Sequence, residues 1–214
     1  MQIRFGSATD AEAIAGIRIE SWRAAYAGLI PAAILDRELG GYDAGRARRA
    51  FASRPWQRVL IAEQPPGPLP PPAASAASAA SAASVPVPVP ASTAQATVVG
   101  YAAFGPEQGL DGRPRTARGG PRPAQSLAAE LYALYVAPAY WSTGAGRALM
   151  GRVLEEAQAE GYPRIVLWVL EQNARARRFY ERAGFRLRGR NPAHSLGWLG
   201  GIPEVCYTRE LIHR

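Results

Sequence analysis

Residues 130–150, ELYALYVAPAYWSTGAGRALM, constrain the fold more than any other stretch of this 214-residue chain. The first half is a nearly continuous run of strand-forming residues, which Pro138 ends because proline has no N–H to donate to a sheet. From the Gly144-Ala-Gly146 turn onward, apolar residues recur four apart, as they do along one face of a helix: Ala145, Leu149, Val153 and Ala157. The stretch therefore predicts a strand, a glycine-containing turn and a helix.

The glycine turn, with Gly144 and Gly146, is a candidate anion site. The first N–H groups of a helix lack partners within the helix and lie at the positive end of its dipole, which favours phosphate or pyrophosphate. Glycine also serves only to turn the chain at many strand–helix connections, so the turn alone leaves both interpretations open. A second block, residues 167–185, adds a strand and a helix, with Asn173 at the N-cap position and Gly184 just past the end.

Together the two blocks resemble the GNAT superfamily, the acetyl-CoA-dependent N-acetyltransferases. The phosphate-loop pattern of that family, Gln/Arg-x-x-Gly-x-Gly/Ala, corresponds to residues 141–146, where Trp141 replaces the usual basic or amide residue. The Phe-Tyr-x-x-x-Gly-Phe ending corresponds to residues 179–185. The resemblance implies the α/β GNAT fold: a mixed, mostly antiparallel twisted sheet of about six to seven strands, flanked by about four helices and splayed at its central strands.

The resemblance also implies how acetyl-CoA is held. The pyrophosphate would lie on the amides of the turn, the pantetheine would pair along the strand, and the Val136 N–H would point at the thioester oxygen. Arg147 is alternatively a solvated helix residue, and Asn173 alternatively only a helix cap. The expected cofactor-binding residues are Leu134, Tyr135, Val136, Trp141, Gly144, Ala145, Gly146, Arg147, Ala148, Asn173 and Tyr180.

Two residues are candidates for proton transfer. Tyr180 matches the family tyrosine whose hydroxyl reaches the CoA sulfur, and a phenol is protonated at neutral pH. Glu130 is the only carboxylate of the central strand and a candidate general base or water relay; its alternative is a strand-end residue facing solvent. Trp22 and Tyr26 match a region that walls the acceptor pocket in the family, or they simply pack in the core.

Composition narrows the classes of partner. The net charge is +8 and every basic residue is Arg, a balance that suits a polyanion such as coenzyme A. The Arg residues are spread along the chain, so nucleic acid is not the expected partner, although a nucleic-acid-associated protein remains a third class. With one cysteine, Cys206, and two histidines we expect neither an internal disulfide nor a metal site.

The chain reads as one N-acetyltransferase domain, residues 1–214. Residues 64–96 are rich in Pro, Ala and Ser and predict a disordered insertion at a hairpin tip; residues 109–126 predict a second flexible loop. Other strands are expected at 2–5, 58–63, 97–104, 164–170, 185–189 and 204–211, and other helices at 10–26, 31–39, 43–53 and 174–183. Thr9 to Glu12 has the form of a capping box for the first of these helices.

The expected function is transfer of an acetyl group from acetyl-CoA to a primary amine, by direct attack in a ternary complex. The alternative is a catalytically silent CoA-binding sensor or partner-binding module. The acceptor is a small-molecule or peptide amine that the sequence does not identify, and a homodimer stays open because many relatives dimerise. No apolar run approaches the roughly 18 residues of a membrane helix, and no signal-peptide core is present, so we expect a cytoplasmic protein without a membrane partner.

Overall fold

The computed structural model describes residues 1–65, 96–108, 128–190 and 201–211. In these residues a seven-stranded sheet has the order β1-β2-β3-β4-β5-β7-β6. The strands are β1 Gln2–Phe5, β2 Arg58–Gln64, β3 Thr97–Pro106, β4 Ala129–Val136, β5 Arg164–Leu170, β6 Arg186–Arg190 and β7 Glu204–Glu210. The α-helices are α1 Ala11–Tyr26, α2 Ala32–Gly40, α3 Ala44–Ser53, α4 Ala145–Ala159 and α5 Ala174–Arg182.

The sheet is mixed, and β4 and β5 are its parallel pair. The other neighbouring strands run antiparallel, including the β2–β3 hairpin, in which Gln64 pairs with Thr97. The expected hairpin is thus confirmed. The predicted insertion of residues 64–96 lies almost entirely outside the described residues, as does the predicted loop of residues 109–126.

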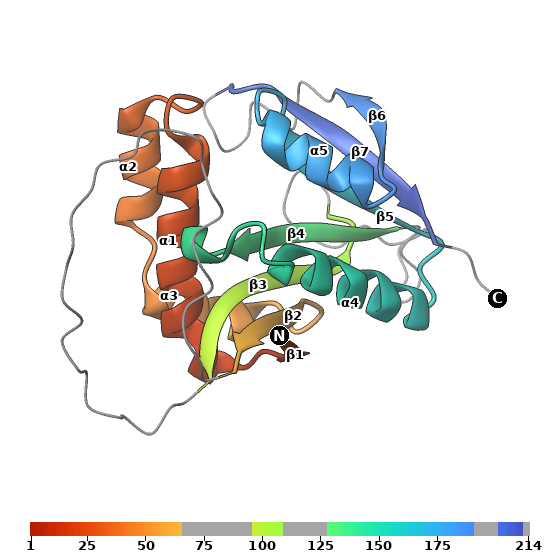
Figure 1. The fold of residues 1–214 in the computed structure, drawn as a ribbon, viewed down its shortest axis with the longest axis horizontal. Coiled ribbons are helices and arrows are strands. Elements are labelled where there is room, and N and C mark those ends of the chain that lie inside the picture. The colour runs from red at the N-terminus through yellow and green to blue at the C-terminus, as the bar shows by residue number, and fades with distance from the viewer. Residues whose placement is uncertain (66–95, 109–127, 191–200, 212–214) are drawn as a thin grey trace, which may run out of the picture.

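Helices cover both faces of the sheet (Figure 1). On one face α4 buries Leu149, Met150 and Val153 against the central strands, and α5 packs beside it. On the other face α1 and α3 pack against β2 and β3 through Ile14, Ile17 and other apolar residues. Alternate strand residues point to opposite faces, so the nearly continuous apolar run of β3 supplies both cores, with Phe104 on one face and Tyr101 and Ala103 on the other.

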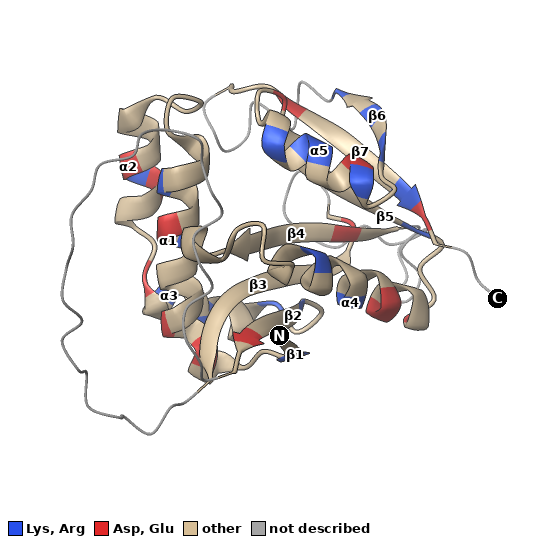
Figure 2. Ribbon diagram, in the orientation of Figure 1, with Lys and Arg blue, Asp and Glu red and all other residues tan. Residues whose placement is uncertain are grey.

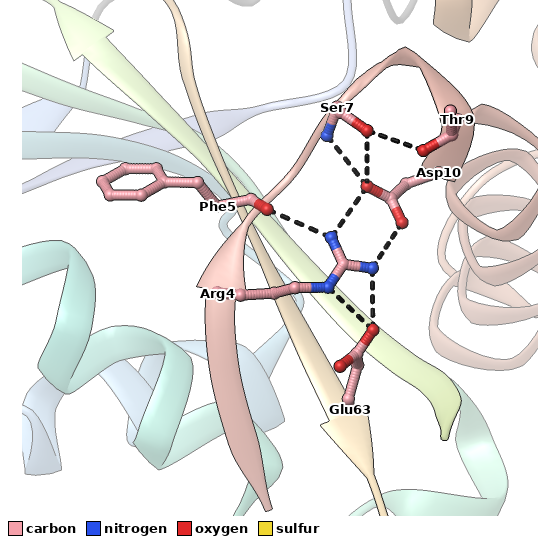
Figure 3. A network of polar contacts seen from close by, with 6 residues as sticks. All are labelled: Arg4, Phe5, Ser7, Thr9, Asp10 and Glu63. Carbon is pink, nitrogen blue, oxygen red and sulfur yellow. Dashed lines mark hydrogen bonds and ion pairs between the residues drawn. The ribbon is translucent and has the colours of Figure 1, made fainter. Parts of the chain in front are cut away.

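A polar network fixes the N-terminal strand to the first helix (Figure 3). Arg4 bridges the carboxylates of Asp10 and Glu63 at 2.6 and 2.7 Å. Asp10 also accepts a hydrogen bond from the Ser7 backbone N–H at 2.8 Å. The predicted capping box at Thr9 to Glu12 is therefore wrong by two residues, because the carboxylate that reaches back is Asp10 and the N–H that it reaches is that of Ser7.

The mixed, mostly antiparallel sheet with helices on both faces is confirmed. The described residues hold five α-helices, which match the five helical segments expected along the chain, where the resemblance implied about four. Strands β1 and β5 have the predicted bounds, and most other ends shift by one or two residues, as helix and strand ends commonly do. Within the described ranges, no helix has the length and apolar character needed to cross a membrane.

Candidate active site

The sheet opens between its two central strands. Strand β4 pairs with β5 only from Ala129 to Leu131, and beyond that point the two strands part toward α1 (Figure 1). At the same level the β3–β4 register shifts: Ala103 pairs with Ala133 but Phe104 with Leu131, so Tyr132 is an extra residue on β4. This β-bulge bends β4 away from β5.

The parted strands border a cleft of about 1480 Å³. Its wall includes the end of β4, the start of α4, the exposed side of α5 and, on the opposite face, parts of α1 and α3. The cleft thus passes through the sheet, with an opening toward α4 and α5 and another toward α1 and α3. Two molecules can enter from opposite faces and meet beside the end of β4.

The backbone of Val136 faces this cleft. The next residue, Ala137, donates its N–H to Val99 O in β3 at 2.8 Å, so by strand alternation the N–H and C=O of Val136 point away from β3. The Val136 carbonyl accepts hydrogen bonds from the Ser21 hydroxyl at 2.9 Å and from the Trp141 indole N–H at 2.7 Å. These two bonds hold the strand end in place while its N–H faces the β5 side.

The turn before α4 is shaped as an open helix N-terminus. Gly144 is the N-cap, with a φ of 99°, and a Cβ built there would meet nothing within 4 Å. Ser142 also has a positive φ, 66°, which is uncommon outside glycine. The Ala148 N–H donates to Gly144 O at 2.9 Å, so it is already used within the helix, and the candidate anion donors narrow to the amides of Gly144 to Arg147.

A cation lies beside this turn although position 141 is not basic. The Arg175 guanidinium lies 3.9 Å from the centroid of the Trp141 ring, a cation–π contact. Arg175 is the second residue of α5, which carries several basic residues (Figure 2). Arg147, in the first turn of α4, lines the same cleft. A cation is thus stacked on Trp141, the residue that replaces the usual basic or amide residue of the resembled pattern.

Three tyrosines face one another across the cleft. Tyr180 from α5, Tyr135 from β4 and Tyr26 from α1 line the same cavity. Burial raises the pKa of Tyr180 above its ordinary value, and the nearby Tyr135 raises it further. Burial likewise raises the pKa of Tyr26, with contributions from Tyr135, Tyr180 and Glu204. Tyr180 therefore keeps its proton at neutral pH and points into the cleft that Val136 borders.

Two buried carboxylates also line the cleft. Glu130, 9 % exposed, lies in the paired part of β4, where its Oε2 accepts a hydrogen bond from the Gln108 N–H at 2.8 Å. Its alternative interpretation as a solvent-facing strand end is wrong, because the side chain is buried. Glu204, 5 % exposed, opens β7 at the other end of the cleft near Tyr26.

Of the remaining predicted residues, some line the cleft and others are buried in the core behind it. Ala145, the first residue of α4, is buried in the core, and Leu134 packs against the same core while lining the cleft; Gly146 faces Phe179 of α5. Asn173 caps α5 by accepting from the Ala176 N–H at 3.0 Å, and it also lines the cleft. Trp22 is fully buried and stands behind the cavity wall, where its ring meets Tyr26 edge-on at 5.1 Å.

Residues of this site that sequence reasoning missed include Ser21, Arg175 and Glu204. A serine inside a helix and an arginine on a charged helix carry no distinctive pattern, since each matters through a partner distant in sequence. Glu204 offered one signal, a carboxylate directly before the apolar residues Val205, Cys206 and Tyr207. Among the described residues no group of three or more His, Cys, Asp or Glu gathers in a way that could hold a metal ion.

Known proteins are similar to this chain in sequence and in fold. Residues 62–185, more than half of the chain, match the family model described as Acetyltransferase (GNAT) family. An uncharacterised N-acetyltransferase of Mycobacterium bovis is 47 % identical over 60 residues, 28 % of this chain and 38 % of that protein. Another, YuaI of Bacillus subtilis, is 24 % identical over 99 % of this chain and 98 % of its own length.

Among solved structures, yncA of Salmonella typhimurium with acetyl-CoA has a TM-score of 0.63, at 21 % identity over 100 % of this chain and 95 % of its own. At that identity the likeness concerns the fold, and the family match rests on sequence. The splayed sheet, the glycine turn at α4 and the tyrosine on α5 lie within the matched residues. The chain therefore belongs to the GNAT family of acetyltransferases.

Proposed function

We propose that this protein transfers an acetyl group from acetyl-CoA to a primary amine by direct attack within a ternary complex. The observation that carries the proposal is the end of β4–β5 pairing at Leu131, which leaves the backbone of Val136 facing a cleft between the α4 turn and Tyr180. Acetyl-CoA enters from the α4 and α5 face, and the amine enters from the face of α1 and α3.

The CoA phosphates bind where backbone donors and cations converge. The amides of Gly144, Ala145, Gly146 and Arg147 offer N–H groups at a helix N-terminus, and Arg147 and Arg175 add positive charge. Trp141 contributes indirectly, since its ring supports Arg175. The pantetheine arm then runs along the cleft-facing edge of Leu134, Tyr135 and Val136, with the Asn173 side chain at its other side.

The acetyl group is activated by the Val136 N–H. Attack of the amine nitrogen on the thioester carbon places negative charge on the carbonyl oxygen, and a fixed backbone donor stabilises that charge. Collapse of the tetrahedral intermediate breaks the C–S bond and leaves a thiolate. Tyr180, a phenol that is protonated at neutral pH, gives its proton to the thiolate.

The attacking amine must itself lose a proton, and we assign this step to Glu130. The Gln108 N–H holds one oxygen of its carboxylate, so a water molecule is the expected link between the other oxygen and the amine. Glu204 is the rival, since it is equally buried in the same cleft. Glu130→Gln and Glu204→Gln, each assayed over a range of pH, separate the two candidates. The variant that lacks the general base has a lower kcat, and its kcat/KM no longer falls as an acidic group becomes protonated.

The test of the proposed function is release of CoA thiol from acetyl-CoA in the presence of a panel of amines, such as polyamines, aminoglycosides, amino acids and peptide N-termini. Release that requires a particular amine, together with an acetylated product, supports transfer. A protein that only senses CoA would bind acetyl-CoA and release no thiol with any amine. Burial raises the pKa of the Cys206 thiol to about 11, so this residue adds little background to a thiol reagent near neutral pH.

A further inference from the structure

Arg18 of α1 holds a positive charge in the cleft wall on the acceptor side. Its guanidinium lies 4.3 Å from the ring centroid of Trp22, 4.5 Å from that of Tyr42 and 5.8 Å from that of Tyr135. Aromatic rings on several sides fix the position of the group, and Tyr101 is within hydrogen-bonding reach. Arg18 also lines the cleft, so the fixed charge is presented to whatever enters it.

No carboxylate neutralises Arg18 in the part of the chain that the structure describes. Other arginines there do pair: Arg4 with Asp10 and Glu63, Arg58 with Glu160, and Arg152 with Glu156. In the same described residues, the Arg18 Nε is buried and has no hydrogen-bond partner. Cation–π contacts compensate part of the cost of removing a guanidinium from water, but they do not supply an acceptor for the buried Nε–H.

A guanidinium presents its donors as a planar fork, which matches the two oxygens of a carboxylate. The charge lies near the point where transfer is proposed, because Tyr135, whose ring it approaches, directly precedes Val136 in β4. Ser21, one helical turn beyond Arg18 on α1, bonds the Val136 carbonyl itself. An anion bound at Arg18 thus lies about one turn of α1 away from Ser21, the residue that holds the end of β4 where the acetyl group is proposed to be activated.

We propose that the acceptor is a small amino carboxylic acid and that Arg18 binds its carboxylate while its amine meets the thioester beside Val136. This inference rests on the proposed function and adds a substrate class to it. Arg18 is a specificity residue in this account: it touches the acceptor and takes no proton. An amine of the same shape that lacks the carboxylate leaves the guanidinium unpaired and binds less tightly.

The experiment compares amino acids with the amines formed by their decarboxylation: leucine with isoamylamine, phenylalanine with phenethylamine, and lysine with cadaverine. Each is titrated calorimetrically into the protein saturated with CoA and, separately, tested for thiol release from acetyl-CoA. The carboxylate-bearing member of at least one pair is expected to bind about tenfold more tightly or better. Arg18→Met is expected to lose that preference, and Arg18→Lys to retain part of it.

Arg23→Met is the matched control, because Arg23 lies on the same helix, is exposed and does not line the cleft. It should keep the preference for the carboxylate-bearing member. Equal binding of the two members of every pair by the unaltered protein, binding of neither, or a preference that survives in Arg18→Met, overturns the proposal. If Arg18→Met does not fold, the Arg18→Lys variant and the unaltered protein still decide it.

The two proposals fail in different ways. If thiol release is absent with every amine while carboxylate-dependent binding at Arg18 is measured, the acetyl-transfer mechanism falls and the carboxylate site stands. If amines without a carboxylate are acetylated as efficiently as their amino-acid counterparts, the acetyl-transfer mechanism stands and the assignment of Arg18 falls.

Discussion

The Trp141 indole N–H donates to the Val136 carbonyl at 2.7 Å, so the residue that opens the phosphate turn is tied to the strand end where the acetyl group is proposed to lie. The same ring carries the Arg175 guanidinium. A single side chain therefore connects the strand end to the cation beside the proposed phosphate site. Position 141, where the resembled pattern has Gln or Arg, thus has a cation stacked on it from α5.

Arg175→Gln should weaken acetyl-CoA binding about three- to fivefold, since the lost contact is an exposed charge interaction. The effect should shrink as salt is raised, because screening weakens the same interaction in the unaltered protein. Calorimetric titration at two salt concentrations measures both. Arg186→Gln, an exposed substitution on β6 outside the cleft, is the control. An equal loss in both variants would mean that net charge, and not the position of Arg175, matters.

Gly144→Glu should abolish acetyl-CoA binding, because it places bulk and negative charge at the open helix N-terminus and strains a backbone with φ of 99°. Gly161→Glu is the control that separates the effect of backbone strain from the effect on the binding site. Gly161 has a comparable φ of 84°, lies beyond the opposite end of α4 and has equally open space around it. Both variants should lose similar thermal stability, while only Gly144→Glu loses binding. Unimpaired binding by Gly144→Glu would remove the phosphate turn from the account.

Tyr180→Phe should reduce kcat by about a hundredfold or more, because it removes the proposed proton donor to the thiolate. Acetyl-CoA affinity should stay nearly unchanged, since the ring and its packing against Phe179 and Phe185 remain. Steady-state kinetics with a parallel binding titration make the comparison. Tyr162→Phe, which alters a tyrosine buried beneath α4, is the matched control and should keep full turnover. A parallel drop in kcat and affinity would indicate a packing role for Tyr180.

Stability should fall as pH rises above about 10, where tyrosines of an unfolded chain ionise. Burial raises the pKa of Tyr26, Tyr101 and Tyr180 in the folded protein, so these groups keep protons that the unfolded chain releases. The unfolded state then binds fewer protons, and the free energy of unfolding decreases with pH. Urea unfolding from about pH 8 to about pH 11 measures the slope. Tyr101→Phe should flatten it, and a slope that is already flat in the unaltered protein would contradict the burial of these hydroxyls.

Much of the fold is predictable because its signals are local. Strand β5 follows from one apolar run, and the bounds of α1 and α5 follow from helix periodicity and from the Asn173 cap. The misplaced cap at the start of α1 has a tertiary reason: Asp10 is held by Arg4, whose position depends on the pairing of β1 with β2. Sequence alone contains both residues but not their proximity.

The residues of the candidate site also divide into those with a local sequence signal and those without one. The glycine turn and Tyr180 belong to recognisable local patterns, and the structure brings them to one cleft. Arg18 and Arg175 had no such pattern, since a cation stacked on an aromatic ring depends on two segments meeting in space. Trp22 had a plausible place in the pocket wall, yet packing of α2 against α1 buries it fully.

The most direct test of acetyl transfer follows the acetyl group itself. The protein is incubated with acetyl-CoA that carries a deuterated acetyl group and with the acceptor amines, and both protein and amine are then examined by intact mass spectrometry. The account predicts that the label is on the amine nitrogen, with one CoA thiol released for each acetylated amine and no label on the protein. Label retained on the protein, or thiol released without an acetylated amine, would contradict direct transfer in the cleft beside Val136.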